Sequence, residues 1–143
     1  MCSSDLPDTY RRWAFPYERE VVAAIAAHGG TMGIHVCGDA TRIIDDLVAT
    51  EARFLQVDHK IDRARCKAAA AGRTTLIGTV DPSETLTRGT ASAVRAAAAR
   101  DLDTLAPGGG FILSPGCSLP YTAPAENVAA LVRAAHELGR YPA

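Results

Sequence analysis

The sequence predicts an α/β fold built from parallel strands with covering helices. Ala-rich segments with apolar residues at helical spacing alternate along the chain with short runs of apolar and β-branched residues. The order is one helix followed by four strand–helix units, which is typical of a parallel sheet with crossover helices. The strand runs are short and apolar, as in buried parallel sheets. We expect residues 1–143 to form a single domain, because this length is enough for a sizeable core.

An opening helix and the first two strands come from the first half of the chain. Apolar residues at helical spacing predict a helix over residues 17–28, and a glycine pair directly after it favours its end there. Residues 31–36 follow as a short strand. Residues 40–50 place their apolar side chains on one helical face, and residues 54–57 (FLQV) form the second strand. Residues 62–71 form the next helix, which ends before a glycine.

The second half of the chain adds two more strands and their helices. Residues 74–80 (TTLIGTV) are the most strand-like run in the sequence. Helices are expected over residues 83–87 and 91–105, with a glycine between them. A Pro-Gly-Gly-Gly segment then breaks the chain before the fourth strand at 111–114, and the last helix covers residues 125–138.

Composition and charge exclude several classes of protein. With 15 Lys and Arg against 16 Asp and Glu, the chain has no basic excess for binding nucleic acid. Its apolar content excludes a disordered chain, and it has no run of about 18 apolar residues that would predict a membrane span. The first residues lack the apolar core of a signal peptide. We therefore expect a cytoplasmic protein whose four cysteines are free thiols or metal ligands rather than disulfides.

Two architectures fit four strand–helix units. One is an open, doubly wound sheet. The other is part of an eight-stranded β/α barrel, which typically has about 250 residues. Both place functional side chains at the carboxyl ends of the strands. Each expected strand is followed by a polar or thiol residue, so these residues are expected to share one edge of the sheet.

The most specific feature is the His-Val-Cys triplet at the end of the first expected strand. Alternate residues of a strand point to the same side, so His35 and Cys37 can bind one ion together. Cys117, after the fourth strand, can supply a third ligand on the same edge. Two sulfurs and one nitrogen suit Zn²⁺, and three protein ligands leave a position open for a substrate thiol, as in catalytic zinc sites.

The other polar and thiol residues have structural as well as functional explanations. An isolated His-x-Cys arises by chance, and a buried cysteine is usually a small core residue, so spacing alone leaves both interpretations open. Asp58 and Asp81 follow the second and third strands. Each has two interpretations, a substrate-binding residue or a cap for the segment that follows it. We expect Cys2 to have no role and Cys66 to pack on a helix face. His59 follows a strand end, where it would line the site or be a loop histidine, and we expect the latter.

Several segments resemble, in the same order, the C-terminal half of the uroporphyrinogen decarboxylase superfamily. They are HVCG at 35–38, GTVDP at 78–82, GGFILS at 109–114, PGC at 115–117 and PAENV at 124–128. Within that superfamily, the sequence is most similar to the zinc-dependent corrinoid methyltransferases of the methylcobamide:coenzyme M type.

The resemblance implies a fold, a metal and a reaction. The implied fold is a TIM-like (β/α)8 barrel, of which this chain has the last four units. The implied zinc ligands are His35, Cys37 and Cys117. The implied reaction transfers a methyl group from a methylated corrinoid, carried by a partner protein, to a small thiol that zinc activates as a nucleophile.

Two alternatives remain open from the sequence. The first is uroporphyrinogen decarboxylase-type decarboxylation in porphyrin biosynthesis, which needs no metal. That branch has a histidine in a Gly-His-Gly segment where this chain has Gly116-Cys117-Ser118. The second is an inactive zinc-binding remnant or subunit, because four strands of a barrel leave two unpaired edges. A homodimer or a second subunit would complete such a half barrel.

Overall fold

Four parallel strands form one sheet in which neighbours in sequence are neighbours in space. The computed structural model describes residues 7–141, and the sheet order is β1-β2-β3-β4. The strands are β1 (Gly33–Val36), β2 (Phe54–Val57), β3 (Thr75–Val80) and β4 (Phe111–Pro115). The α-helices are α1 (Pro7–Trp13), α2 (Phe15–Ala27), α3 (Ile44–Ala49), α4 (Arg63–Ala70), α5 (Ala91–Leu105) and α6 (Ala125–Leu138). A short 3-10 helix, η2 (Thr41–Ile43), leads into α3.

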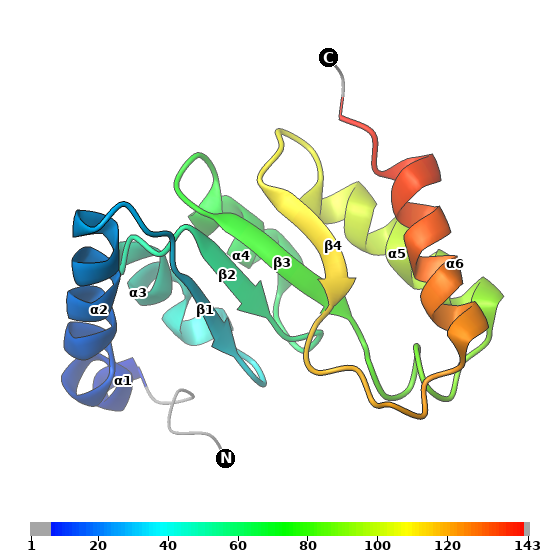
Figure 1. Cartoon of the computed structure of the whole chain (residues 1–143), viewed down its shortest axis with the longest axis horizontal. Helices are drawn as coiled ribbons and strands as arrows, with labels where there is room; N and C mark the ends of the chain where they lie inside the picture. The colour runs from blue at the N-terminus through cyan, green and yellow to red at the C-terminus, as the bar shows by residue number, and fades with distance from the viewer. Residues whose placement is uncertain (1–6, 142–143) are drawn as a thin grey trace.

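The strand register aligns the carboxyl ends of neighbouring strands. Val36 at the end of β1 pairs with Val57 at the end of β2. Val80 at the end of β3 pairs with Pro115 at the end of β4. Figure 1 shows all four strands running in the same direction. Residues that follow the strands therefore meet at one edge of the sheet, where β/α folds carry their functional groups.

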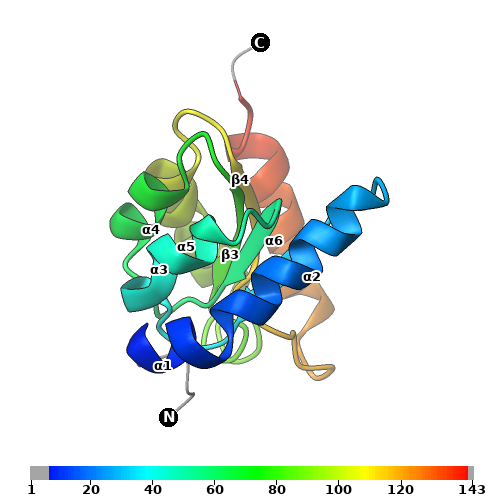
Figure 2. The ribbon, with the colours of Figure 1, turned by 90° about the vertical axis from the view of Figure 1, so that its left-hand side faces the viewer.

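Helices cover one face of the sheet. In Figure 1, α3, α4 and α5 lie behind the strands, while α2 and α6 flank the two outer strands, and Figure 2 shows the same arrangement from the side. The strand side chains that pack against the helices are nearly fully buried, namely Ile34, Leu55, Leu76 and Phe111. On the opposite face, the Ile112 side chain is 47% exposed. Within the described chain, helices therefore cover the sheet on one side.

The expected α/β class with four parallel strands is confirmed, and the arrangement is that of half a TIM-like (β/α)8 barrel. Within residues 7–141, β1 and β4 each have one strand neighbour, so each has an open edge. No helix in this part of the chain is both long and apolar enough to cross a bilayer.

One expectation about helices was incomplete and one was wrong. The helix expected over 17–28 corresponds to α2, and a separate helix, α1, precedes it. The helix expected over 83–87 does not form, and the segment makes successive turns. Its start is held by Asp81, whose Oδ1 accepts hydrogen bonds from the amides of Ser83 (2.8 Å) and Glu84 (3.0 Å). An aspartate that caps its own following backbone in this way favours a turn over a helix.

Two buried polar side chains connect elements behind and beside the sheet. Asp101 on α5 is 2% exposed and accepts hydrogen bonds from Arg63 Nε on α4 (2.6 Å) and Thr79 Oγ1 on β3 (2.8 Å). Asn127 on α6 is 1% exposed, and its Nδ2 donates to two carbonyls in the loop after β3, at 3.0 and 2.8 Å. The two Asn127 bonds fix the long β3–α5 connection onto α6, because a buried side-chain amide is costly to leave unpaired.

Candidate metal centre

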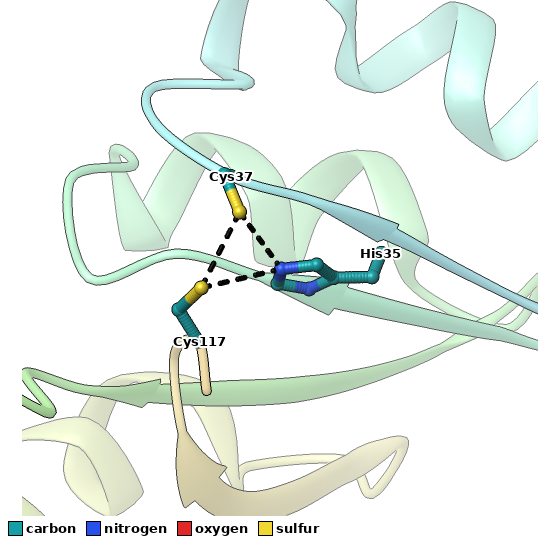
Figure 3. Close-up of side chains that lie close together, drawn as sticks. All are labelled: His35, Cys37 and Cys117. Carbon is teal, nitrogen blue, oxygen red and sulfur yellow. Dashed lines mark hydrogen bonds between the residues drawn. The ribbon is translucent and has the colours of Figure 1, made fainter. Parts of the chain in front are cut away.

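An imidazole and two thiols converge at the carboxyl edge of the sheet. His35 Nε2 lies 3.0 Å from Cys37 Sγ and 3.5 Å from Cys117 Sγ, and the two sulfurs are 3.3 Å apart. Figure 3 shows the three side chains pointing toward one another from two segments that are 80 residues apart in sequence. His35 and Cys37 are exposed and Cys117 is half-buried, so the cluster is accessible from outside.

Local geometry explains the first two members of the cluster. His35 lies on β1 and Cys37 follows directly after the strand, so both side chains point to the same side. Gly38, the next residue, has φ +84°, a left-handed conformation that turns the chain away and that side chains rarely adopt. The chain therefore leaves β1 immediately after presenting the two donors.

The third member arrives by a loop that crosses the ends of the inner strands. In a flat sheet, β1 and β4 would lie three strand spacings apart, about 14 Å. After β4, Gly116 N donates to Val80 O at the end of β3 (2.8 Å). A Cβ on Gly116 would lie 2.7 Å from His59 N, so the loop touches the backbone that follows β2. This path carries Cys117 to the donors of β1.

The donor set fits a zinc ion. Tetrahedral zinc, with Zn–S near 2.3 Å and Zn–N near 2.0–2.1 Å, places two sulfurs about 3.8 Å apart and a sulfur and nitrogen about 3.6 Å apart. The observed separations are 3.5, 3.3 and 3.0 Å, so they differ from these values by about 0.1 to 0.6 Å, which small side-chain rotations supply. Two thiolates also balance a divalent charge. His35, Cys37 and Cys117 are thus the residues of this chain that would hold such an ion.

Beside the thiols, a histidine bridges two aspartates from neighbouring strand ends. Asp58, which is 6% exposed, accepts a hydrogen bond through Oδ2 from Gly38 N (2.8 Å). Its Oδ1 lies 2.6 Å from His59 Nδ1 and accepts from Lys60 N (3.3 Å). His59 Nε2 lies 3.4 Å from Asp81 Oδ2. Asp58 therefore holds the backbone of Gly38, the residue next to Cys37, by a hydrogen bond.

His59 is more than the loop histidine that we expected from the sequence. It joins the ends of β2 and β3 through the two aspartates, and its backbone supports Gly116 next to Cys117. The available sequence signal was its position directly after Asp58 at a strand end. The two aspartates were predicted as substrate-binding residues, and the structure places both at the edge of the sheet that carries the thiols.

Other thiols and histidines lie away from the cluster. Cys66 is fully buried on α4, as predicted, and burial raises the pKa of its thiol to about 12. His28 caps the end of α2, and its Nδ1 lies 2.9 Å from Ala24 O; His136 lies in the last turn of α6. Cys2, for which we expected no role, lies outside the described residues.

The fold and the side-chain cluster point to a class of protein: a β/α-barrel-type fold with a His/Cys/Cys group at its strand ends whose donor atoms lie close enough together to hold one metal ion. The family model "Uroporphyrinogen decarboxylase (URO-D)" matches residues 6–138. The chain belongs to this family, as its sequence motifs indicated.

Three relatives are 28–31% identical to the chain over the aligned residues. Methylcobamide:CoM methyltransferase MtaA from Methanosarcina barkeri is 31% identical over 140 residues, or 96% of this chain and 39% of that protein. Methylcobamide:CoM methyltransferase MtbA from Methanosarcina acetivorans is 28% identical over 126 residues, 88% of this chain and 36% of that protein. A uroporphyrinogen decarboxylase from Burkholderia thailandensis is 30% identical over 134 residues, 92% of this chain and 36% of that protein.

A solved structure has the same fold as this chain over part of its own length. A methyltransferase from Methanosarcina mazei superposes with a TM-score of 0.82 at 27% identity, covering 94% of this chain and 38% of that chain. The chain thus spans less than two fifths of the length of these relatives.

Proposed function

We propose that this chain is the zinc-binding part of a methyltransferase that moves a methyl group from a methylated corrinoid to a small thiol. The observation that carries the proposal is the convergence of His35, Cys37 and Cys117 at the carboxyl edge of a half barrel. The sequence likeness to two methylcobamide:CoM methyltransferases supports the same class of reaction.

The proposed chemistry assigns each side chain a task. When bound, zinc would supply Lewis acidity that favours the thiolate form of the substrate. Cys37 and Cys117 would hold the ion as thiolates and His35 as a neutral imidazole, and three protein ligands leave one position for the substrate sulfur. In the transfer, a sulfur–carbon bond forms, the cobalt–carbon bond breaks with its electron pair left on the corrinoid, and the thiol proton goes to solvent.

The surrounding residues position these donors. Asp58 holds the Gly38 amide at 2.8 Å and so fixes the backbone next to Cys37. We keep Asp58 and Asp81 as proposed substrate-binding residues, and the contacts of both carboxylates with His59 hold them at the edge of the sheet that carries the thiols. Replacing either aspartate with asparagine is then expected to raise the KM for the thiol more than it lowers kcat.

The proposal includes partners as well as a reaction. We propose that residues 1–143 form one domain containing the last four β/α units of the barrel. The open edges of β1 and β4 would be completed by further strands, from a longer polypeptide, a second subunit or a second copy of this chain. The methyl donor would be carried by a corrinoid protein that reaches the exposed donors His35 and Cys37.

Zinc content tests the metal centre directly. After dialysis against zinc-free buffer, the natural chain is expected to retain about one zinc per chain and the Cys117→Ser variant to lose most of it. A Cys66→Ser variant is a matched control, because Cys66 is a buried thiol away from the cluster. If the natural chain holds no zinc, the proposal is wrong.

Turnover tests the reaction itself. With methylcobalamin as donor and a series of small thiols, the zinc-loaded chain is expected to form thioether, while the Cys117→Ser variant does not. Thiol binding should also release a proton, which a weakly buffered titration measures. Retained zinc without thioether in any thiol or partner condition would support an inactive zinc-binding protein instead.

A further inference from the structure

A second concave site lies at the opposite end of the sheet from the thiols. The loops that precede β2, β3 and β4 surround a hollow of about 230 Å³. Arg53 comes from the first loop, Arg73 from the second and Gly108–Gly110 from the third, while Lys67 reaches in from α4. Figure 1 shows the loops before β3 and β4 side by side at the top of the view, away from the strand ends that carry the metal centre.

The charge of this hollow is entirely positive. Three of the residues that line it are cationic, Arg53, Lys67 and Arg73, and no aspartate or glutamate lines it. Within residues 7–141, neither of the two arginines forms an ion pair with a carboxylate. Because the whole chain has a net charge of −1, this local excess of positive charge does not follow from composition.

The backbone holds the two arginines in place. Arg53 N donates to Met32 O (2.9 Å), and Arg53 O accepts from Thr75 N (3.1 Å), so this residue is tied to the segments that lead into β1 and β3. Arg73 N donates to Ala70 O (2.9 Å) at the end of α4. The backbone of both arginines is therefore held by hydrogen bonds at the wall of the hollow, which fixes where their side chains start.

The glycine loop and the lysine form the rest of the wall. Gly108, Gly109 and Gly110 have φ of +75°, +77° and +70°, three successive left-handed residues, so the loop bends in a way that side chains rarely allow. Lys67 Nζ donates a hydrogen bond to Gly109 O, which holds the ammonium at the edge of the hollow. Burial lowers the pKa of Lys67.

We propose that this hollow binds a small anion of the phosphate class. Guanidinium groups donate paired hydrogen bonds that match the oxygens of phosphate, and the lysine adds a point charge. The volume of about 230 Å³ is below the roughly 300–1,000 Å³ of pockets for drug-sized ligands, so the ligand is a free phosphate or a small phosphate ester. The site is independent of the metal centre and of the proposed methyl transfer.

Phosphate titration of the full 143-residue chain tests this proposal. At constant ionic strength, inorganic phosphate is expected to bind saturably with one site per chain, measured by calorimetry and by amide chemical shifts of Gly108–Gly110 and Arg73. The Arg53→Gln/Arg73→Gln variant is expected to bind about tenfold more weakly or worse, since each guanidinium supplies charge-assisted hydrogen bonds. Acetate at the same concentration should compete poorly, while a small phosphate ester competes well.

A matched control separates a specific site from a general charge effect. Arg88→Gln/Arg95→Gln removes the same charge from two exposed arginines, whose partners are Glu84 and Glu137, and should leave phosphate affinity unchanged. Circular dichroism would verify that both variants fold. The proposal is overturned if binding does not saturate, if acetate binds equally well, or if both double variants lose affinity to the same extent.

Discussion

Gly116 lies where the loop after β4 touches the end of β2, and replacing it with alanine perturbs the metal centre without removing a ligand. The added Cβ would lie 2.7 Å from His59 N and 3.2 Å from Asp58 Cα, both backbone atoms. Ordinary contact begins at 3.4 Å, so the two segments must separate by about 0.7 Å. Cys117, the next residue, moves with the loop.

The size of that displacement sets the expected effect. Side-chain rotation must already supply about 0.1 to 0.6 Å to bring the three donors to zinc distances. A backbone shift of about 0.7 Å adds to that mismatch, and metal–ligand distances tolerate only about 0.2 Å, so Cys117 Sγ is displaced from an ion held by Cys37 and His35. We expect zinc affinity to fall about 10- to 100-fold, as when groups that orient metal ligands are lost. This corresponds to about 1.4–2.8 kcal/mol. Overpacking should also lower the free energy of unfolding by about 1–3 kcal/mol.

Competition with a chromophoric chelator would measure zinc affinity for the natural chain and for Gly116→Ala. Gly139→Ala is the matched control, because its Cβ would lie 2.6 Å from another backbone atom, Ala135 O, at the end of α6 away from the thiols. The control is expected to lose stability but to keep its zinc affinity. The reasoning is refuted if Gly116→Ala binds zinc as tightly as the natural chain, or if both variants lose affinity equally.

Three further predictions concern buried groups. In a Cys2→Ser background, a thiol reagent should label Cys37 and Cys117 quickly and Cys66 about 100-fold more slowly, because Cys66 is fully buried and burial raises its thiol pKa to about 12. Mass spectrometry of tryptic peptides would measure this, and comparable rates would contradict it. The same raised pKa means that the thiol ionises near its ordinary pKa of 9.0 in the unfolded chain but stays protonated when folded. Stability should therefore fall as pH rises above about 9, by up to roughly 1.4 kcal/mol per pH unit for this thiol, in urea melts of the natural chain. Cys66→Ala should lose this part of the fall and keep the part due to the buried Tyr10 phenol, whose pKa burial also raises above its ordinary 10.0. Asp101→Asn should lower the free energy of unfolding by about 2–3 kcal/mol, since it leaves a partly buried guanidinium without its counter-charge. A loss below about 0.5 kcal/mol, the value of an exposed pair, would show that this network contributes little.

Most helices and strands could be predicted because their patterns are local. The strand expected at 54–57 and the helices expected at 91–105 and 125–138 have the observed bounds of β2, α5 and α6. Apolar periodicity alone specifies such elements. The segment 83–87 was misassigned because Asp81 bonds to its amides and favours a turn.

The sequence by itself determined the class of fold and the types of donor at the strand ends. The spacing of His35 and Cys37 is enough to put both on one side of a strand, because alternate side chains of a strand share a face. Motifs along nearly the whole chain also identified the family correctly.

Only the tertiary structure decided how distant segments meet. Cys117 reaches Cys37 because the loop after β4 crosses two strand ends, and that path depends on the close contact between Gly116 and His59. The bond from Gly38 to Asp58 and the grouping of Arg53 with Arg73 likewise join loops from different β/α units. Such contacts follow from the order and register of the strands and the course of the loops, which no local pattern of residues encodes.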